Sequence, residues 1–220
     1  MRKNQLKLVL FAFALGLGLS SCHDDVEPIY ESFALLTKQS STDYAIKLDN
    51  GTFVKLADDL DVSDFADSTR LVMQYHIISS VDTASVVDLL WCDEVLSKPY
   101  MEYSEEVLDS IGSDPLRVSQ VWFAHDYLNV RFLYDGEGNK AHMINLLNVT
   151  PAEDGSLLTF ELRHNAVGEC PVYRYSGVAS FKIQNLLKNV KGEVNIKIKY
   201  VDSVSSEKTI TVQYDKNTDK

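Results

Sequence analysis

The sequence predicts an all-β protein in which a small barrel precedes an antiparallel β-sandwich. From Ser32 onward, polar and apolar residues alternate with a period near two, as they do along half-buried strands. Turn-forming residues interrupt this alternation at intervals of about ten residues, which is typical of antiparallel sheets. Helical patterns are short, because only residues 58–67 and 185–188 suggest single turns. None of these patterns predicts a helix long enough to organise the fold.

The first half of the chain contains enough strands for a small barrel. Asn50-Gly51 is the strongest short signal for a hairpin, and alternating residues flank it on both sides. About five such strands can close into a barrel that leaves no exposed edge. We therefore assign residues 32–108 to a barrel domain. The strands identified in it are residues 44–49, 52–56, 70–79 and 86–96.

The second half of the chain reads as a sandwich. A polar stretch that combines Gly, Asp and Pro, residues 109–116, is predicted to link the barrel to a second domain, residues 117–220. His125-Asp126 is expected to form the tight turn of one hairpin, and residues 151–155 the turn of another. The number of strands and their hairpin connections indicate two packed sheets. The strands are residues 118–123, 127–134, 140–149, 157–164, 177–183, 193–201 and 208–214.

The amino terminus has the layout of a signal peptide. Basic residues precede an apolar stretch, residues 8–19, which is too short for a stable transmembrane helix of about 20 residues. The Leu-Ser-Ser-Cys sequence that ends at Cys22 resembles the lipobox of bacterial lipoproteins, in which a peptidase cuts before a cysteine that carries diacylglycerol. We expect residues 1–21 to be removed and lipid on Cys22 to hold the protein to a membrane.

The residues that follow Cys22 are mostly acidic. His23, Asp24 and Asp25 resemble the export signal that directs lipoproteins of the Bacteroidota to the outer face of the outer membrane. The alternative is a solvated acidic tether over residues 22–31, which is common after any lipobox. We expect an outer-membrane protein that faces the cell exterior, although the sequence leaves the leaflet open.

Charge and composition exclude one class of partner. The chain has a formal charge of −11, and loss of Arg2, Lys3 and Lys7 with the signal peptide makes it −14. Such a body repels phosphate backbones, and no basic cluster is present in the sequence, so we expect no nucleic-acid partner. Cys92 lies in an apolar run and Cys170 in a loop of the other domain, so free thiols are expected rather than a disulfide.

Four passages resemble those of a known family. They are residues 109–115 (DSIGSDP), 126–132 (DYLNVRF), 144–146 (INL) and 162–166 (LRHNA). In this order and spacing, the chain resembles the NigD-like lipoproteins of the Bacteroidota over nearly all of its expected mature length. The resemblance implies an amino-terminal OB-like barrel followed by a β-sandwich. It implies no catalytic residue, and the family takes its name from a bacteriocin gene cluster.

Two histidines are candidate metal ligands. The hairpin around residues 151–155 is expected to place His142 opposite His164, on a face shared with apolar residues. A metal site needs a third ligand, for which His125 or Asp126 is a candidate at a turn that the sequence cannot place. Alternatively, one histidine caps the end of the core and bonds a backbone carbonyl, while the other faces water.

Motifs of known enzyme classes are absent from the sequence. It contains no Gly-x-Ser-x-Gly elbow, Walker loop, Cys-x-x-Cys pair or His-Glu-x-x-His. Acidic neighbours such as Asp58-Asp59 and Glu105-Glu106 do not suit a glycosidase, because neighbours on a strand point to opposite faces and cannot flank one bond. We therefore expect no catalytic residue and no cofactor.

Aromatic residues near loops are the best leads to a binding function. Trp122 and Tyr127 are candidates for contacting a sugar or a protein, although they could instead pack between the two domains. The expected function is non-enzymatic: a surface lipoprotein that binds an envelope protein or a glycan. Two alternatives stay open, a bacteriocin-associated immunity or secretion accessory protein and a metal-dependent hydrolase that uses His142 and His164. The aromatic residues in this group are Tyr100, Tyr103, Trp122, Tyr127, Tyr173 and Tyr175.

Overall fold

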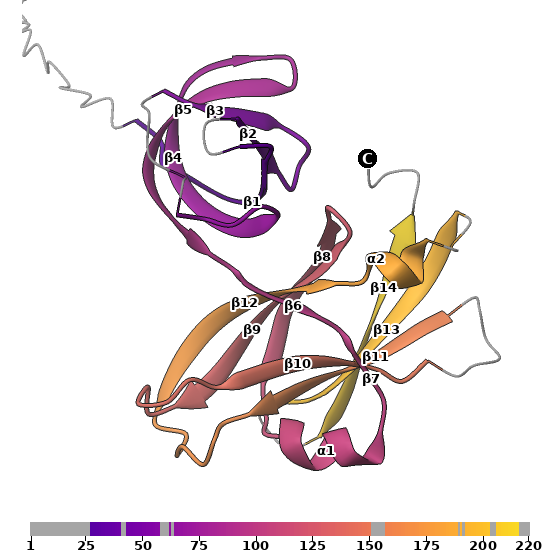
Figure 1. The fold of residues 1–220 in the computed structure, drawn as a ribbon. Helices are drawn as coiled ribbons and strands as arrows, with labels where there is room; N and C mark the ends of the chain where they lie inside the picture. The colour runs from indigo at the N-terminus through magenta and orange to yellow at the C-terminus, as the bar shows by residue number, and fades with distance from the viewer. Residues whose placement is uncertain are drawn as a thin grey trace, which may run out of the picture.

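The computed structural model contains two β domains, a barrel and a sandwich, which Figure 1 shows one above the other. The predicted signal peptide, residues 1–21, and the predicted lipidation and export residues Cys22, His23, Asp24 and Asp25 lie outside the described residues. No helix in the described ranges is long and apolar enough to cross a membrane. The structure describes residues 27–40, 43–57, 62, 64–150, 157–188, 190, 192–202 and 206–215.

The barrel closes in the strand order β1-β2-β3-β5-β4, which is the order of an OB fold. The predicted hairpin at Asn50-Gly51 joins β2 to β3, and β3 runs parallel to β5 to complete the closure. Alternate side chains fill the interior, so that Leu36 and Met73 are completely buried. The strands are β1 (Tyr30–Lys38), β2 (Tyr44–Leu48), β3 (Phe53–Leu56), β4 (Thr69–Val81) and β5 (Ala84–Glu94).

The sandwich packs a sheet of order β14-β13-β11-β10-β7 on a sheet of order β6-β12-β9-β8. Phe160 and Phe181 are completely buried in the core between them. The predicted all-β class, with a barrel followed by a sandwich, is therefore confirmed. Its strands are β6 (Leu96–Pro99), β7 (Met101–Glu102), β8 (Arg117–Ala124), β9 (Tyr127–Gly136), β10 (Met143–Asn148), β11 (Leu157–Asn165), β12 (Tyr173–Lys182), β13 (Glu193–Val201) and β14 (Glu207–Asp215). Two short helices, α1 (Glu105–Ile111) and α2 (Gln184–Leu187), complete the domain.

Three pairings among the described strands of the sandwich are parallel rather than antiparallel. They join β6 to β12, β7 to β10 and β11 to β13. The alternation of polar and apolar residues carries no information on strand direction. The pairings were predicted to be antiparallel from the spacing of the turns, which does not distinguish a hairpin from a crossover to the other sheet. Parallel neighbours need a crossover between them, and here the intervening strands of the other sheet supply it.

The domain boundary lies earlier than the predicted linker at residues 109–116. Strands β6 and β7 fall within residues 32–108, which were assigned to the barrel, yet they pair with β12 and β10 of the sandwich. The chain passes from β5 to β6 at Val95. Residues 109–116 instead end α1 and cover the sandwich, where the Leu116 amide donates to the Val201 carbonyl. A segment that contains Gly and Pro can either end a helix or link two domains, so the composition of residues 109–116 could not distinguish the two.

The register of β10 with β11 also differs from the prediction. Ile144 lies opposite His164, whereas the prediction placed His142 there. The predicted turn, residues 151–155, lies outside the described residues. A shift of two residues keeps every side chain on the same face of the sheet, so the apolar pattern cannot distinguish the two registers.

Candidate functional site

A buried ion pair within the barrel forms hydrogen bonds to the sandwich. Arg70, near the start of β4, is completely buried and donates two hydrogen bonds to Asp49, which directly follows β2, at 2.6 and 2.7 Å. Its guanidinium also reaches into the sandwich, where it donates to Asn129 Oδ1 at 3.1 Å. Asn129 accepts a further hydrogen bond from the Ser180 hydroxyl at 2.6 Å. A planar guanidinium that forms several such bonds fixes its partners in one geometry.

The two aromatic binding candidates belong to this junction. The indole Nε1 of Trp122 donates to Asp49 Oδ2 at 2.7 Å, and its ring packs on Phe33 with centroids 5.2 Å apart. The Arg70 guanidinium lies 5.6 Å from the centre of the Tyr127 ring. The structure thus places Trp122 and Tyr127 between the domains, so neither ring is free to stack on a ligand.

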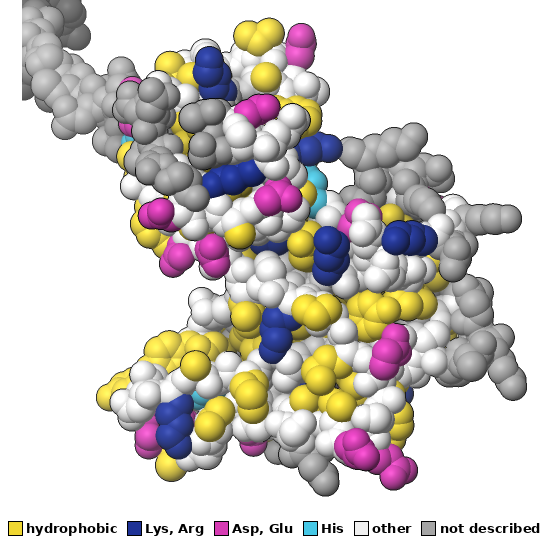
Figure 2. All heavy atoms as spheres, in the orientation of Figure 1, with side chains coloured by type: hydrophobic (Ala, Val, Ile, Leu, Met, Phe, Trp, Pro, Cys, Tyr) yellow, Lys and Arg dark blue, Asp and Glu magenta, His cyan; other side chains and the backbone are white. Residues whose placement is uncertain are grey.

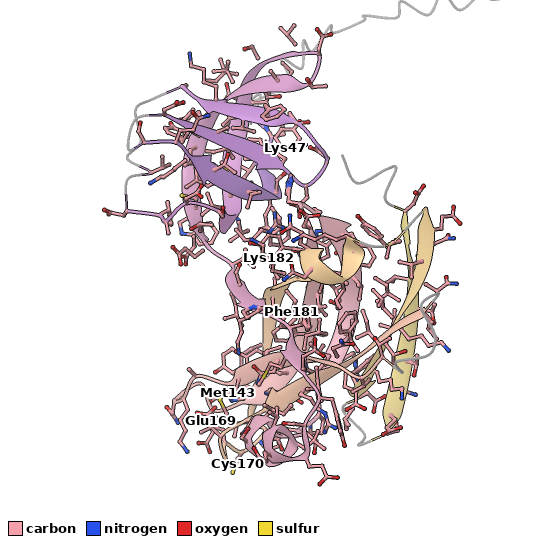
Figure 3. All side chains as sticks on the ribbon, turned by 45° about the vertical axis from the view of Figure 1, so that its right-hand side comes forward. Lys47, Met143, Glu169, Cys170, Phe181 and Lys182 are labelled. Carbon is pink, nitrogen blue, oxygen red and sulfur yellow. The ribbon has the colours of Figure 1, made fainter. Side chains whose placement is uncertain are left out.

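A cleft of about 460 Å³ opens beside the junction. Three segments form it: the β2–β3 turn of the barrel, the β8–β9 turn of the sandwich, and the end of β14. Figure 3 shows Lys47 on the barrel above this region. The lining residues are Lys47, Asp49, Asn50, Gly51, Phe123, Ala124, His125, Asp126, Gln213, Tyr214 and Asp215.

The β8–β9 turn positions His125 in the cleft. His125 and Asp126 have φ angles of 54° and 67°, so both adopt the left-handed conformation that a tight two-residue hairpin turn requires. The Gln184 side chain donates to Asp126 Oδ2 at 2.9 Å, and the Ile183 amide donates to the Asp126 carbonyl. These bonds hold the turn in place from α2 and the residue that precedes it.

The imidazole of His125 has unused hydrogen-bonding capacity. Its Nε2 is buried without a hydrogen-bond partner among the described residues, and Asp49 Oδ1 is 3.5 Å away, beyond a good hydrogen bond. Burial lowers the pKa of His125, and the charges of Arg70 and Lys47 lower it as well; the Asp49 carboxylate and a hydrogen bond with the Leu48 backbone act in the opposite direction. A buried polar nitrogen without a partner is costly, and a ligand in the cleft could satisfy it.

The cleft is lined mainly by polar groups. Carboxylates outnumber cations among the described lining residues, which include Asp49, Asp126 and Asp215 but only one Lys or Arg, Lys47. The hydroxyl groups of a neutral ligand can donate hydrogen bonds to carboxylates and accept them from an ammonium or an amide. Phosphate groups would be repelled by the carboxylates. Phe123 and Tyr214 supply an edge-to-face ring pair with centroids 5.3 Å apart.

The two histidines considered as metal ligands meet at the opposite end of the sandwich. His142 Nδ1 and His164 Nε2 are 2.8 Å apart. The other two ring nitrogens are also occupied: His142 Nε2 lies 3.1 Å from Glu169 Oε2, and His164 Nδ1 lies 3.0 Å from the Pro115 carbonyl. The side chains of His142 and Glu169 are 4% and 1% exposed, and His164 is 2% exposed. Figure 3 shows Glu169 far from the barrel.

Hydrogen-bond matching assigns the protons of this cluster. Burial raises the pKa of Glu169, but the hydrogen bonds from His142 and three backbone amides outweigh it and lower this pKa to about 2. Glu169 is therefore a carboxylate, which can only accept, so His142 Nε2 carries a proton. The Pro115 carbonyl can only accept, so His164 Nδ1 carries one too. A hydrogen bond between the two rings requires one further proton between His142 Nδ1 and His164 Nε2, and burial acts against that charge by lowering the pKa of His164.

The histidine cluster ties loops together. Glu169 accepts hydrogen bonds from the amides of Glu137, Gly138 and Asn139, which lie in the β9–β10 loop. His164 holds the segment that contains Pro115 through a hydrogen bond to a backbone carbonyl, as one part of the alternative expected, but His142, which that alternative expected to face water, is buried in the cluster. No group of three or more His, Cys, Asp or Glu in the described part of the chain is arranged to hold a metal ion. The geometry fits a structural ion pair with every ring nitrogen engaged.

The partners that complete both clusters were not predicted from the sequence. Asp49 was assigned to the end of one strand and Arg70 to the start of another. Glu169 is far in sequence from His142 and stands in a loop whose path no periodicity predicts. One feature of the sequence could have indicated the junction. An Arg and an Asp each lie at the end of a largely apolar strand, where they could form an ion pair.

The remaining aromatic candidates are dispersed. Tyr100 packs edge-on against Phe160, with centroids 6.4 Å apart, and Tyr175 stacks on Tyr134 at 5.5 Å. Tyr103 and Tyr173 are exposed. They do not form one surface with the cleft, since none of them lines it.

The two cysteines occupy different domains. Cys92 is half-buried on β5 of the barrel, whereas Cys170 is exposed in the loop before β12 of the sandwich. Both are free thiols in the structure.

Several solved structures have the same fold. A protein of Parabacteroides distasonis proposed to be toxin-related is 22% identical, with a TM-score of 0.74 over 87% of this chain and 96% of that one. A NigD-like immunity protein of Bacteroides caccae is 17% identical, with a TM-score of 0.68 over 85% and 97%. A protein of Bacteroides fragilis proposed to be a lipoprotein is 12% identical, with a TM-score of 0.65 over 85% and 98%. Identities this low establish a shared fold.

Comparison with curated proteins gives no match. The model of the NigD-like C-terminal β-sandwich domain, by contrast, matches residues 99–214, more than half of the chain. Its start within β6 agrees with the domain boundary seen in the structure. The chain therefore belongs to the NigD-like family.

Proposed function

We propose that the protein is a non-enzymatic binding module, anchored by lipid on Cys22 to the outer membrane and displayed at the cell exterior, that binds a neutral glycan in the cleft between its domains. The lipobox supports the anchor, because two or three acyl chains on one residue hold a protein firmly to a bilayer. The export signal that His23, Asp24 and Asp25 resemble supports surface display.

The observation that carries the binding site is the unpartnered Nε2 of His125 in a preformed cleft. The hydrogen bonds from Arg70 to Asn129 and from Trp122 to Asp49 fix the two domains relative to each other, so the cleft walls are in place before a ligand arrives. Small-molecule sites are usually largely preformed concavities of about 300–1,000 Å³ with a few well-placed polar groups. The cleft meets these requirements at about 460 Å³.

The lining favours a neutral, hydroxyl-rich ligand over other envelope molecules. The carboxylates in the lining, those of Asp49, Asp126 and Asp215, disfavour anionic polysaccharides and nucleic acids, and the formal charge of −11 acts in the same direction. An apolar ligand would remove these carboxylates from water, at a cost of several kcal/mol in general.

Calorimetry with variants of the cleft tests this proposal. The acylated protein in detergent micelles is titrated with a panel of neutral and anionic oligosaccharides. We expect a neutral oligosaccharide to bind and His125→Ala to weaken it about tenfold, the effect of one buried hydrogen bond. His76→Ala, which removes a half-buried histidine of the barrel outside the cleft, is the matched control and should leave the affinity unchanged. Binding confined to anionic sugars, or unaffected by His125→Ala, contradicts the proposal.

Immunity against a bacteriocin is a second candidate. It is supported by the shared fold with the Bacteroides caccae protein, whose name describes it as a NigD-like immunity protein. Expression of the chain in a bacteriocin-sensitive strain tests this function. Immunity predicts that more cells survive the bacteriocin when the chain is expressed than when it is not.

A further inference from the structure

Exposed apolar side chains gather on one hairpin of the barrel. Among the described residues, Ile77, Ile78 and Val81 of β4 and Leu90 and Trp91 of β5 are between 40% and 71% exposed. Figure 1 shows this hairpin at the end of the barrel that faces away from the sandwich, and Figure 2 shows hydrophobic side chains at that end. Large apolar groups exposed together mark interaction surfaces rather than ordinary solvent-facing strands.

Two β-bulges turn apolar residues outward on this hairpin. Gln74 pairs with Trp91 and Tyr75 with Leu89, which leaves Leu90 as the extra residue of one bulge. Ile77 pairs with Val87 and Ser79 with Val86, which leaves Ile78 as the extra residue of the other. An extra residue re-aims its side chain relative to the regular alternation. Leu90 and Ile78 are 46% and 60% exposed as a result.

The path of the chain brings the same hairpin close to the predicted anchor. The Pro28 carbonyl lies 3.0 Å from His76 Nδ1, so the chain is held against β4 one residue before Ile77. Pro28 lies six positions after Cys22, and a fully extended chain of that length spans about 20 Å. Ile29 and Tyr30, which follow Pro28, are themselves 61% and 42% exposed. A lipid on Cys22 therefore holds this hairpin near the bilayer.

The charge of the hairpin indicates which interactions could hold it to a membrane. Residues 71–97 contain no Lys or Arg, while Asp82, Asp88, Asp93 and Glu94 are acidic. Attraction to anionic headgroups is thus absent from this surface, and only burial of apolar area can hold it to a membrane. Tryptophan and isoleucine suit that role, since Trp is enriched at membrane interfaces and Ile partitions into the acyl region.

We propose that the β4–β5 hairpin, through Ile77, Ile78, Leu90 and Trp91 together with Ile29, inserts into the interfacial region of the bilayer that holds the lipid anchor. The barrel is then the membrane-proximal domain, and the sandwich and the cleft point outward to ligands. This inference rests on the proposed lipid anchor at Cys22. It adds an orientation that the anchor alone would not impose.

Fluorescence quenching by brominated lipid tests the insertion. The full-length acylated protein is reconstituted into neutral phosphatidylcholine vesicles with or without bromine on the acyl chains. Trp91 and Trp122 are the only tryptophans, and Trp91→Phe isolates the signal of Trp122 at the domain junction. We expect bromine to reduce the Trp91 emission at least twofold, and the quenching to be the same at low and high salt.

Variants separate insertion from anchoring. Ile78→Ser/Leu90→Ser should abolish the quenching of Trp91 while the protein still floats with the vesicles, because the acyl chains remain. The control Val172→Ser, at a residue of the sandwich that is 57% exposed, should keep full quenching. An unchanged Trp122 emission shows that each variant is folded.

The outcomes distinguish this inference from the proposed function. If the protein does not float with vesicles, the lipid anchor fails and the insertion fails with it. If it floats but Trp91 is not quenched, the anchor stands and the insertion is wrong. A Trp91 emission that shifts with protein concentration in detergent, without vesicles, would assign the surface to a second copy of the chain and also overturn the inference.

Discussion

Replacing Arg70 by Met is the sharpest perturbation of the two-domain body. Methionine fills most of the volume of the arginine stem but removes the charge, so Asp49 loses both of its hydrogen bonds from Arg70. Asn129 loses one of its donors as well. The Trp122 indole still donates to Asp49, but no cation remains to balance the carboxylate.

The expected loss of stability follows from burial. Arg70 is 0% exposed and Asp49 is 14% exposed at the side chain. Removing one partner of a buried ion pair costs about 3–5 kcal/mol, because the other charge is left uncompensated. Partial exposure of Asp49 places this variant at the low end, at about 3 kcal/mol. In a domain of this size that corresponds to a fall in Tm of about 6–12 °C.

Differential scanning calorimetry and urea unfolding measure the effect, and a neighbouring ion pair provides the control. Arg131 and Glu31 also join the two domains, at 3.7 Å, but their side chains are 39% and 47% exposed. Arg131→Met should therefore cost less than about 1 kcal/mol, as exposed pairs do. Arg70→Met/Asp49→Asn should recover part of the loss, because neither charge is then left alone.

The reasoning is refuted if Arg70→Met and Arg131→Met destabilise the protein equally. It is also refuted if the Arg70→Met and Asp49→Asn effects simply add, since residues in one buried network must show a coupling energy.

Three further predictions concern the rest of the molecule. Glu169→Gln should flatten the acid limb of the Tm–pH curve: the Glu169 pKa is lowered from 4.5 to about 2 in the folded protein, so its contribution is present above pH 4.5 and is lost as the pH falls towards 2. An unchanged acid limb would contradict the assigned carboxylate. Gly136→Ala should cost about 1–3 kcal/mol in urea unfolding, because its Cβ would lie 2.8 Å from His142 Cε1 and 2.9 Å from Glu169 Oε2; a neutral effect would mean that the cluster is loosely packed. In thiol labelling, Cys170 should react rapidly and Cys92 slowly, because burial raises the pKa of the Cys92 thiol; equal rates would argue against the folded barrel around β5.

Periodicity predicted most of the strands because each strand has one face on a core. Val130 and Phe132 alternate inward on β9, and Asn50-Gly51 specifies its hairpin locally. The same rule failed at β6 and β7, which are short edge strands without an alternating pattern. It could not identify α1 either, since a seven-residue helix ending at Gly112 shares its composition with a linker.

The candidate site was harder to predict than the fold, because its contacts join residues distant in sequence. Arg70 and Asn129 are separated by 59 positions, and His142 and Glu169 by 27. The aromatic residues Trp122 and Tyr127 were recognised as unusual, but whether they face solvent or another domain depends on how the domains pack. His125 was noted as part of a turn, and only the three-dimensional arrangement reveals its free nitrogen beside Asp49.

Nuclear magnetic resonance of the histidine side chains tests the binding cleft most directly. The protein is labelled with ¹⁵N-histidine and titrated with the neutral oligosaccharide that gives the highest affinity in calorimetry. We predict that the ring nitrogens of His125 shift on binding while those of His142 and His164 do not, because these two are already engaged with Glu169 and the Pro115 carbonyl. Saturable binding that leaves the His125 signals unmoved would show that the cleft between the barrel and the sandwich is not the ligand site.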